Sequence, residues 1–205
     1  MARRVATVVA PTARGERTLR ALIDVATDRF ARDGYRGTSV AVISRDAGLG
    51  STTAFVHFAN KEALFLAAVD EDLAAMFREF TVRLIHLAEH DRLEQLLATV
   101  VDIIGRHPLA RRLIAGLEPD FTARVLDSAS FDELRATVVP IVEEGQRRGA
   151  VRPDLPAAEL ADGLMGFVLA MAMASVQIGP AVDRAFGPGI ETVLRGLLTR
   201  DPRLS

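Results

Sequence analysis

Apolar residues recur at spacings of three and four along most of the chain, which is the period of an amphipathic helix. In the first third this pattern predicts four helices. They cover residues 17–34, 38–47, 51–58 and 60 to beyond 75. Gly34 and Gly48 follow the first two, and the hydroxyls of Thr38 and Ser39 and the amide of Asn60 are typical N-caps.

The remaining two thirds show the same helical period. Helices are predicted near residues 92–104, 108–117, 121–127, 131–148, 157–178 and 188–199. Prolines stand at the joints between these segments, except Pro140, which lies inside a helical pattern and is expected to kink it. No segment alternates polar and apolar residues as a β-hairpin does, so the pattern predicts an all-α protein.

The composition narrows the class of protein. Hydrophobic residues make up 49% of the 205 residues, enough for a packed core, and there is no cysteine. This excludes disulfide scaffolds, thiolate zinc sites and cysteine nucleophiles. Residues 1–10 lack the apolar core of a signal peptide. The uncharged stretch 163–182 leaves about 16 helical residues before Gly179–Pro180, short of the roughly 20 that cross a bilayer. We therefore expect a cytoplasmic protein without a membrane partner.

The charge is divided unevenly along the chain. Residues 1–62 carry a formal charge of +4, and the remainder carries −6. A basic head on an acidic body indicates a polyanion as partner of the head. Two short helices joined by a glycine turn after a longer helix also match the helix-turn-helix plan, in which the second short helix enters the major groove of DNA.

The stretch from Phe30 to Glu62 strongly resembles the TetR family of transcriptional regulators. The matching elements are Gly–Tyr after the first helix, Thr–Ser–Val at the second, Ala–Gly–Leu at the turn, an aromatic-x-His-Phe run, and Asn–Lys–Glu at the fourth. The resemblance is specific over residues 17–68. It implies a three-helix helix-turn-helix DNA-binding domain followed by a larger helical ligand-binding and dimerisation domain. We place a basic arm at residues 1–15, the head at 16–62 and the body at 63–205.

Carried over onto this sequence, the resemblance implies a set of DNA contacts. Ser51 and Thr52 would face base edges, with Val56 as a further candidate. Thr53, His57, Lys61 and the Ser39 hydroxyl would hold phosphates. Three positions depart from the family pattern. Phe55 stands where a tyrosine is usual and cannot donate a hydroxyl hydrogen bond, Gly50 replaces a common serine, and Thr52 replaces a common glycine.

For the body, the resemblance implies a small-molecule pocket and pairing with a second copy through the last two long helices. The candidate pocket residues are Phe80, Leu84, Leu97, Val101, Ile104, Leu113, Phe121, Met165, Met173 and Gln177. His86 and His107 are further polar anchors for a largely apolar ligand. The candidate dimer residues are Leu164, Phe167, Val168, Met171, Val193, Leu194 and Leu197.

The sequence therefore predicts a homodimeric repressor, not an enzyme, that a small apolar ligand releases from a palindromic operator. The alternative is a constitutive or architectural DNA-binding protein whose body only dimerises; finding no cavity in the body would favour it.

His86-Leu-Ala-Glu89-His90 matches the His-x-x-Glu-His pattern of some zinc proteases. The chain shows no third ligand for it, so we interpret this run as a solvated helix end and expect neither metal nor cofactor.

Overall fold

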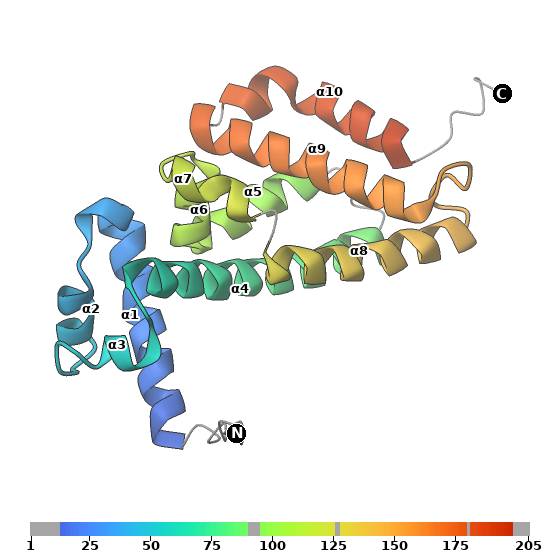
Figure 1. Ribbon diagram of the computed structural model, residues 1–205. Helices are drawn as coiled ribbons and strands as arrows, with labels where there is room; N and C mark the ends of the chain where they lie inside the picture. The colour runs from blue at the N-terminus through green and yellow to red at the C-terminus, as the bar shows by residue number, and fades with distance from the viewer. Residues whose placement is uncertain (1–12, 90–94, 126–127, 180, 199–205) are drawn as a thin grey trace, which may run out of the picture. The chain divides into compact units, whose positions relative to one another are not determined.

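The computed structural model describes residues 13–89, 95–125, 128–179 and 181–198. All regular structure within these ranges is helical, which confirms the predicted all-α class. The chain divides into two compact units, the first ending at Ala68 and the second beginning at Val69. Each unit is described separately below (Figure 1).

Two long elements and two short ones make up the first unit. Helix α1 covers Ala13–Gly37, so the last residues of the expected arm are helical. Gly34 interrupts α1 with a left-handed backbone (φ +76°), as the sequence predicted. The buried Thr38 hydroxyl donates a hydrogen bond of 2.8 Å to the Gly34 carbonyl. Ser39 is the N-cap of helix α2 (Val40–Asp46), and its hydroxyl accepts a hydrogen bond from the Val42 amide.

Helix α3 is shorter than the sequence predicted. It covers Ala54–His57, whereas a helix over residues 51–58 was expected. The amides of Thr53 and Phe55 donate to carbonyls three residues back, at Gly50 and Thr52. Such bonds close tight turns before the regular four-residue pattern starts, and the predicted start at residue 51 is therefore wrong.

An aromatic cluster closes the core of the first unit. Phe30 on α1 and Phe65 on α4 (Lys61–Glu89) meet edge to face with ring centroids 4.9 Å apart, and Tyr35 lies 5.1 Å from Phe65. Around them, fully buried side chains come from every helix of the unit. These are Leu22, Ala26, Ile43, Ala54 and Leu64. The Asn60 carbonyl oxygen on the side chain accepts a 2.8 Å bond from the Ala63 amide, which confirms Asn60 as the cap of α4.

The second unit consists of α4 from Val69 onward and the later helices. These are α5 (Leu96–Arg106), α6 (Pro108–Ile114), α7 (Pro119–Thr122), the 3₁₀ turn η2 (Ala123–Val125), α8 (Ala129–Arg147), α9 (Ala157–Ile178) and α10 (Ala181–Leu198). Helix α9, predicted at the same bounds, packs against α5, α6, α8 and α10 and forms the centre of the unit (Figure 1).

Several predicted boundaries in this unit differ from the structure. Helix α6 ends at residue 114 instead of 117, because Gly116 adopts a left-handed backbone (φ +73°). The segment predicted at 121–127 is divided between α7 and η2. Helix α10 begins at Ala181, not at residue 188, and continues through the Gly-Pro-Gly run at 187–189. Val182 and Leu194, buried on either side of that run, anchor α10 where local sequence disfavours a helix.

Helix α9 is also, by length and composition alone, apolar enough to cross a membrane. It is a 22-residue helix, longer than the uncharged segment considered in the sequence. Only 28% of its most apolar stretch is buried within the chain, although it packs against four other helices. The helix therefore combines a buried core face with half-buried apolar residues and the exposed small residues Gly163, Gly166 and Ala170.

Candidate DNA-binding surface and ligand cavity

Most of the predicted DNA-contacting side chains lie on the turn before α3 and on α3 itself, whereas Ser39 is the N-cap of α2 and Lys61 is the first residue of α4. Ser51, Thr52 and His57 are exposed, and Val56 is 81% exposed although it is apolar. Phe55 is 54% exposed and Thr53 is half-buried. The fully buried Ala54 fixes this segment to the core of the first unit. Exposed apolar side chains on a short helix and exposed hydroxyls on the turn before it are what contacts to thymine methyls and base edges need.

The backbone of this turn accounts for one departure from the family pattern. A Cβ atom on Gly50 would lie 3.3 Å from the Thr53 hydroxyl oxygen, tighter than ordinary contacts. The glycine therefore leaves room for the Thr53 side chain.

Helix α2 is held in place by the Arg29–Asp46 ion pair to α1 and by the buried residues Val40 and Ile43.

Lys61 has a partner that the sequence did not reveal. Its ammonium nitrogen lies 4.5 Å from the centroid of the Tyr35 ring. A cation over an aromatic face is held by the ring quadrupole and remains able to bind an anion on its other side. The adjacent pair Gly34–Tyr35 was noted only as a family motif, and sequence spacing gives no sign that Tyr35 reaches residue 61.

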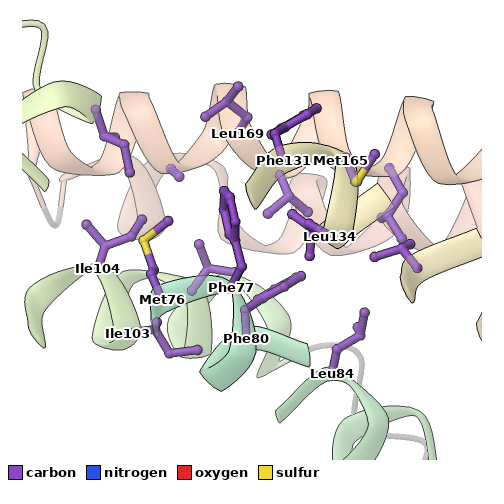
Figure 2. Close-up of a pocket in the computed structure, with 16 residues that line it drawn as sticks. Met76, Phe77, Phe80, Leu84, Ile103, Ile104, Phe131, Leu134, Met165 and Leu169 are labelled. Carbon is purple, nitrogen blue, oxygen red and sulfur yellow. The ribbon is translucent and has the colours of Figure 1, made fainter. Parts of the chain in front are cut away.

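The second unit contains a cavity of about 80 Å³. Helix α4 contributes Met76, Phe77, Phe80 and Leu84 to its wall, and α5 contributes Val100, Ile103 and Ile104. Ile114 of α6 and the α8 residues Phe131, Leu134 and Val138 add to it. Helix α9 supplies Leu164, Met165, Val168, Leu169 and Ala172. Every lining residue is apolar. In Figure 2, Phe77 on α4 and Leu169 on α9 extend toward the same space.

Four of the predicted pocket residues line this cavity: Phe80, Leu84, Ile104 and Met165. Five other predicted pocket residues do not line it: Val101, Leu113, Phe121, Met173 and Gln177. Leu113 and Phe121 are buried in the packing of the second unit instead. The side chain of Leu97 lies outside the described residues. The sequence did not predict several lining residues, among them Met76, Phe77, Phe131 and Leu134. The helical period alone does not distinguish a residue on a cavity wall from one in the core.

None of the three polar anchors proposed from the sequence lines the cavity. His86 is exposed on α4. The side-chain amide of Gln177 donates a 3.2 Å hydrogen bond to the Ile114 carbonyl. His107 lies between two carboxylates, with Nδ1 3.1 Å from Asp72 and Nε2 3.4 Å from Glu79. The proposed anchoring role of these side chains is therefore not supported.

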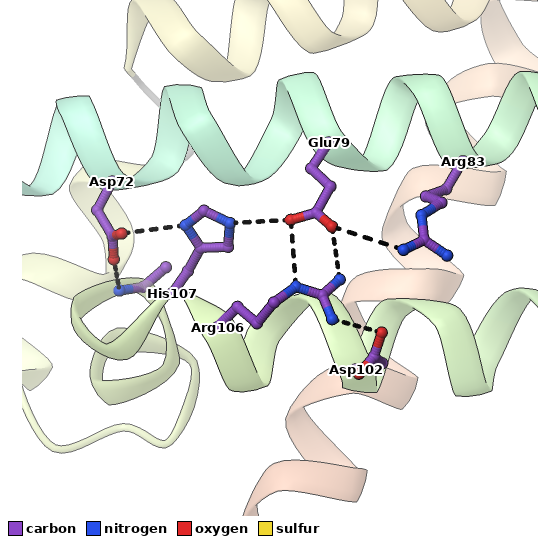
Figure 3. A network of polar contacts seen from close by, with 7 residues as sticks. Asp72, Glu79, Arg83, Asp102, Arg106 and His107 are labelled. Atoms are coloured by element: carbon purple, nitrogen blue, oxygen red, sulfur yellow. Dashed lines mark hydrogen bonds and ion pairs between the residues drawn. The ribbon is translucent and has the colours of Figure 1, made fainter.

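A polar network joins α4 to the α5–α6 junction (Figure 3). The buried Asp72 carboxylate accepts hydrogen bonds from the Leu109 and Ala110 amides, at 3.0 and 2.8 Å. It thus caps the N-terminus of α6, which begins at Pro108. Glu79 accepts a 2.5 Å bond from Arg106, and this bond is the main cause that holds the pKa of the Glu79 carboxyl below its ordinary value.

The predicted dimer residues differ in how far the rest of the chain covers them. Leu164 and Leu194 are buried within the chain, and Leu164 and Val168 line the cavity. Phe167 and Met171 are half-buried on α9, and Val193 is 52% exposed on α10. The side chain of Leu197 lies outside the described residues.

The His-x-x-Glu-His run has no metal site around it in the part of the chain that the structure describes. Among the described residues, no three His, Cys, Asp or Glu side chains lie together as a group that could hold a metal ion. His86 lies in the last turn of α4, and His90 lies outside the described residues.

Sequence comparison finds that most of the first unit matches a known protein family. Residues 22–68 match the family described as bacterial regulatory proteins, tetR family. The regulator UidR of Escherichia coli is 22% identical over 183 residues, covering 87% of this chain and 91% of UidR. The repressor NicS of Pseudomonas putida is 28% identical over 146 residues, covering 68% of each chain.

Comparison of folds extends the likeness to both units. A TetR-family transcriptional regulator from Pectobacterium atrosepticum superposes with a TM-score of 0.69 at 23% identity, over 90% of this chain and 96% of that one. One from Mesorhizobium loti gives 0.65 at 23% identity, over 91% and 95%. These structures share the helix-turn-helix unit followed by a helical unit.

Proposed function

Because the chain belongs to the TetR family of DNA-binding transcriptional regulators, we propose that it is a homodimeric repressor that a small apolar ligand releases from a palindromic operator. The observation that carries the proposal is the apolar cavity in the second unit. A body that only dimerises has no need of a cavity, and its lining loses packing contacts that a filled core would keep.

The proposed contacts with DNA rest on the segment from Ser51 to His57, in which every side chain except Thr53 and Ala54 is exposed. Ser51 and Thr52 are proposed to contact base edges, while Thr53, His57 and Lys61 hold phosphates. The exposed Val56 and Phe55 suit apolar contact with thymine methyls or sugars. The Ser39 hydroxyl, which accepts from Val42, keeps its own proton free to donate to a phosphate.

The dimer rests on the uncovered faces of α9 and α10. Gly163, Gly166 and Ala170 are exposed on α9, and Val193 is 52% exposed on α10. Small residues let helices approach closely, and contiguous apolar surface on a soluble protein marks an interaction site. A closed two-fold dimer would cover both faces with their own copies. Its two heads would meet half-sites about 34 Å apart, one turn of DNA.

Ligand control is proposed to act through α4. Its first turn carries Lys61, and Phe77 and Phe80 farther along the same continuous helix line the cavity. An occupant that displaces these rings would favour a different position of α4, and hence a head spacing that fits the operator less well. Only a ligand that binds the unfit state more tightly shifts this balance. A coupling of about 1–3 kcal/mol corresponds to a 5–150-fold loss of operator affinity.

The test begins with selection of tight-binding duplexes from a random pool. The proposal expects an inverted repeat bound by two chains. Operator affinity is then measured with and without apolar compounds that raise the melting temperature of the protein. Selection of an asymmetric site bound by one chain would refute the dimer. Compounds that bind in the cavity but leave DNA affinity unchanged would favour the constitutive regulator.

A further inference from the structure

We infer that the cavity selects a compact aromatic hydrocarbon without a buried hydrogen-bonding group. This inference deepens the proposed function and rests on it, because it names the chemical class of the ligand for the same site. Four features of the wall support it: its polarity, its rings, its thioethers and its size.

The wall has no polar group for a ligand to bind. All sixteen lining residues are Phe, Met, Leu, Ile, Val or Ala. The neighbouring His107 and Gln177 are engaged with Asp72, Glu79 and the Ile114 carbonyl. A hydroxyl or carboxylate buried in this space would lose its bonds to water and gain none, so polar analogues of a ligand should bind more weakly.

The rings favour an aromatic guest over an aliphatic one. Phe77 and Phe131 meet across the space between α4 and α8, with centroids 6.2 Å apart and planes 70° apart. Phe80 adds a third ring from α4. A planar guest extends this edge-to-face arrangement, which favours aromatic pairs beyond the area that they bury.

The thioethers allow the cavity to adapt. Met76 and Met165 face it from α4 and α9, as Figure 2 shows, and unbranched methionine side chains repack readily and contact ring edges favourably. The space of about 80 Å³ is smaller than the roughly 150 Å³ of an engineered apolar cavity that binds benzene. A single ring therefore fits only if these side chains move, and larger polycyclic guests are disfavoured.

One buried polar atom near the cavity offers a rival interpretation. The Ser175 hydroxyl is buried without a hydrogen-bond partner, one turn beyond Ala172 on α9. It does not line the cavity. If the ligand carried one polar group that reached Ser175, polar analogues would bind more tightly, and Ser175→Ala would remove that advantage.

The experiment uses four probes of similar size on the full chain: toluene, benzyl alcohol, benzoate and heptane. Dissociation constants are measured by calorimetry in a sealed cell. We expect toluene to bind tightest, benzyl alcohol at least about fivefold weaker, and benzoate not detectably. Heptane should bind a few-fold more weakly than toluene because it forms no ring contacts. Ser175→Ala should leave this order unchanged.

A matched pair of variants locates the site. Val138→Thr places a hydroxyl on the cavity wall at a position 1% exposed, and Val142→Thr makes the same change one turn later on α8 at a buried residue that does not line it. Val138→Thr should reduce the preference for toluene over benzyl alcohol several-fold. Val142→Thr should leave the ratio as in the unmodified protein.

Two failures are distinguishable. If benzyl alcohol or benzoate binds more tightly than toluene, or if no aromatic hydrocarbon binds up to its solubility, the inferred ligand class is wrong, while control by another ligand stands. If toluene binds in the expected order but operator affinity is unchanged, the ligand class stands and the proposed release from DNA fails.

Discussion

Asp72 holds His107 and, through the same carboxylate, the beginning of the following helix. One carboxylate oxygen lies 3.1 Å from Nδ1 of His107, and the other accepts bonds from the Leu109 and Ala110 amides. The cap of α6 is thus supplied from α4, 37 residues away in sequence from the nearer amide. Asp72 therefore links the α5–α6 junction to α4, together with Glu79, which binds Arg106 and His107.

Replacing the Asp72 carboxylate should destabilise the folded protein. Asp72→Asn keeps one acceptor oxygen but places an amide donor against the α6 amides or His107. We expect the free energy of unfolding to fall by about 1–3 kcal/mol, the scale of a buried unsatisfied polar group. Chemical denaturation monitored by circular dichroism gives the value. Asp102→Asn, at a side chain 60% exposed, is the matched control and should change stability by less than about 0.5 kcal/mol. Equal effects would show that Asp72 is not the cap.

The Glu79 carboxyl should make the free energy of unfolding depend on pH. The hydrogen bond from Arg106 lowers the pKa of the folded Glu79 carboxyl, so the charged form contributes stability above the pKa of the unfolded chain. This contribution is lost as the pH falls through the lowered folded pKa. The difference in unfolding free energy between the unmodified protein and Glu79→Gln should therefore be largest near neutral pH and shrink in acid. In an Arg106→Gln background, the pH dependence of that difference should be smaller; no change there would contradict the assignment to Arg106.

Variants that remove phosphate contacts and variants that remove base contacts should differ in how their DNA affinity depends on salt. Lys61→Ala should weaken binding to all duplexes alike and make the slope of log affinity against log salt shallower by about one. Ser51→Ala and Thr52→Ala should change sequence preference with little effect on the slope. Tyr35→Leu retains the Lys61 charge but removes the ring beneath it, so it should weaken binding with the slope preserved. An unchanged slope in Lys61→Ala would mean that α4 does not contact the DNA backbone.

The dimer should be sensitive to charge on the uncovered apolar faces. Ala170→Arg and Val193→Arg place a cation on exposed positions of α9 and α10, and we expect both to yield monomers with little operator affinity. Light scattering gives the mass. Val82→Arg changes an apolar residue on α4 that is 68% exposed and should remain dimeric. Leu194 is unsuitable for this test because it is buried within the chain, and an arginine there would unfold it. A mass of one chain for the unmodified protein would refute the dimer.

The sequence by itself determined the helical class, the helix-turn-helix segment and most of its caps. These follow from interactions within a few residues. Ser39 and Asn60 accept from amides three positions ahead, and Gly34 supplies a left-handed backbone that other residues rarely adopt. The start of α3 was wrong because tight turns at Gly50 to Phe55 satisfy the same backbone groups that a longer helix would.

Only the tertiary structure decided which apolar residues line the cavity and what surrounds them. Helical period marks Phe80 and Phe121 alike as interior positions, but whether such a side chain meets another side chain or empty space depends on how the five helices around the cavity cross. The same is true of Asp72 with His107 and of Lys61 with Tyr35. Each pair is separated by 26 or more residues and joined by packing, so no local pattern in the sequence records it.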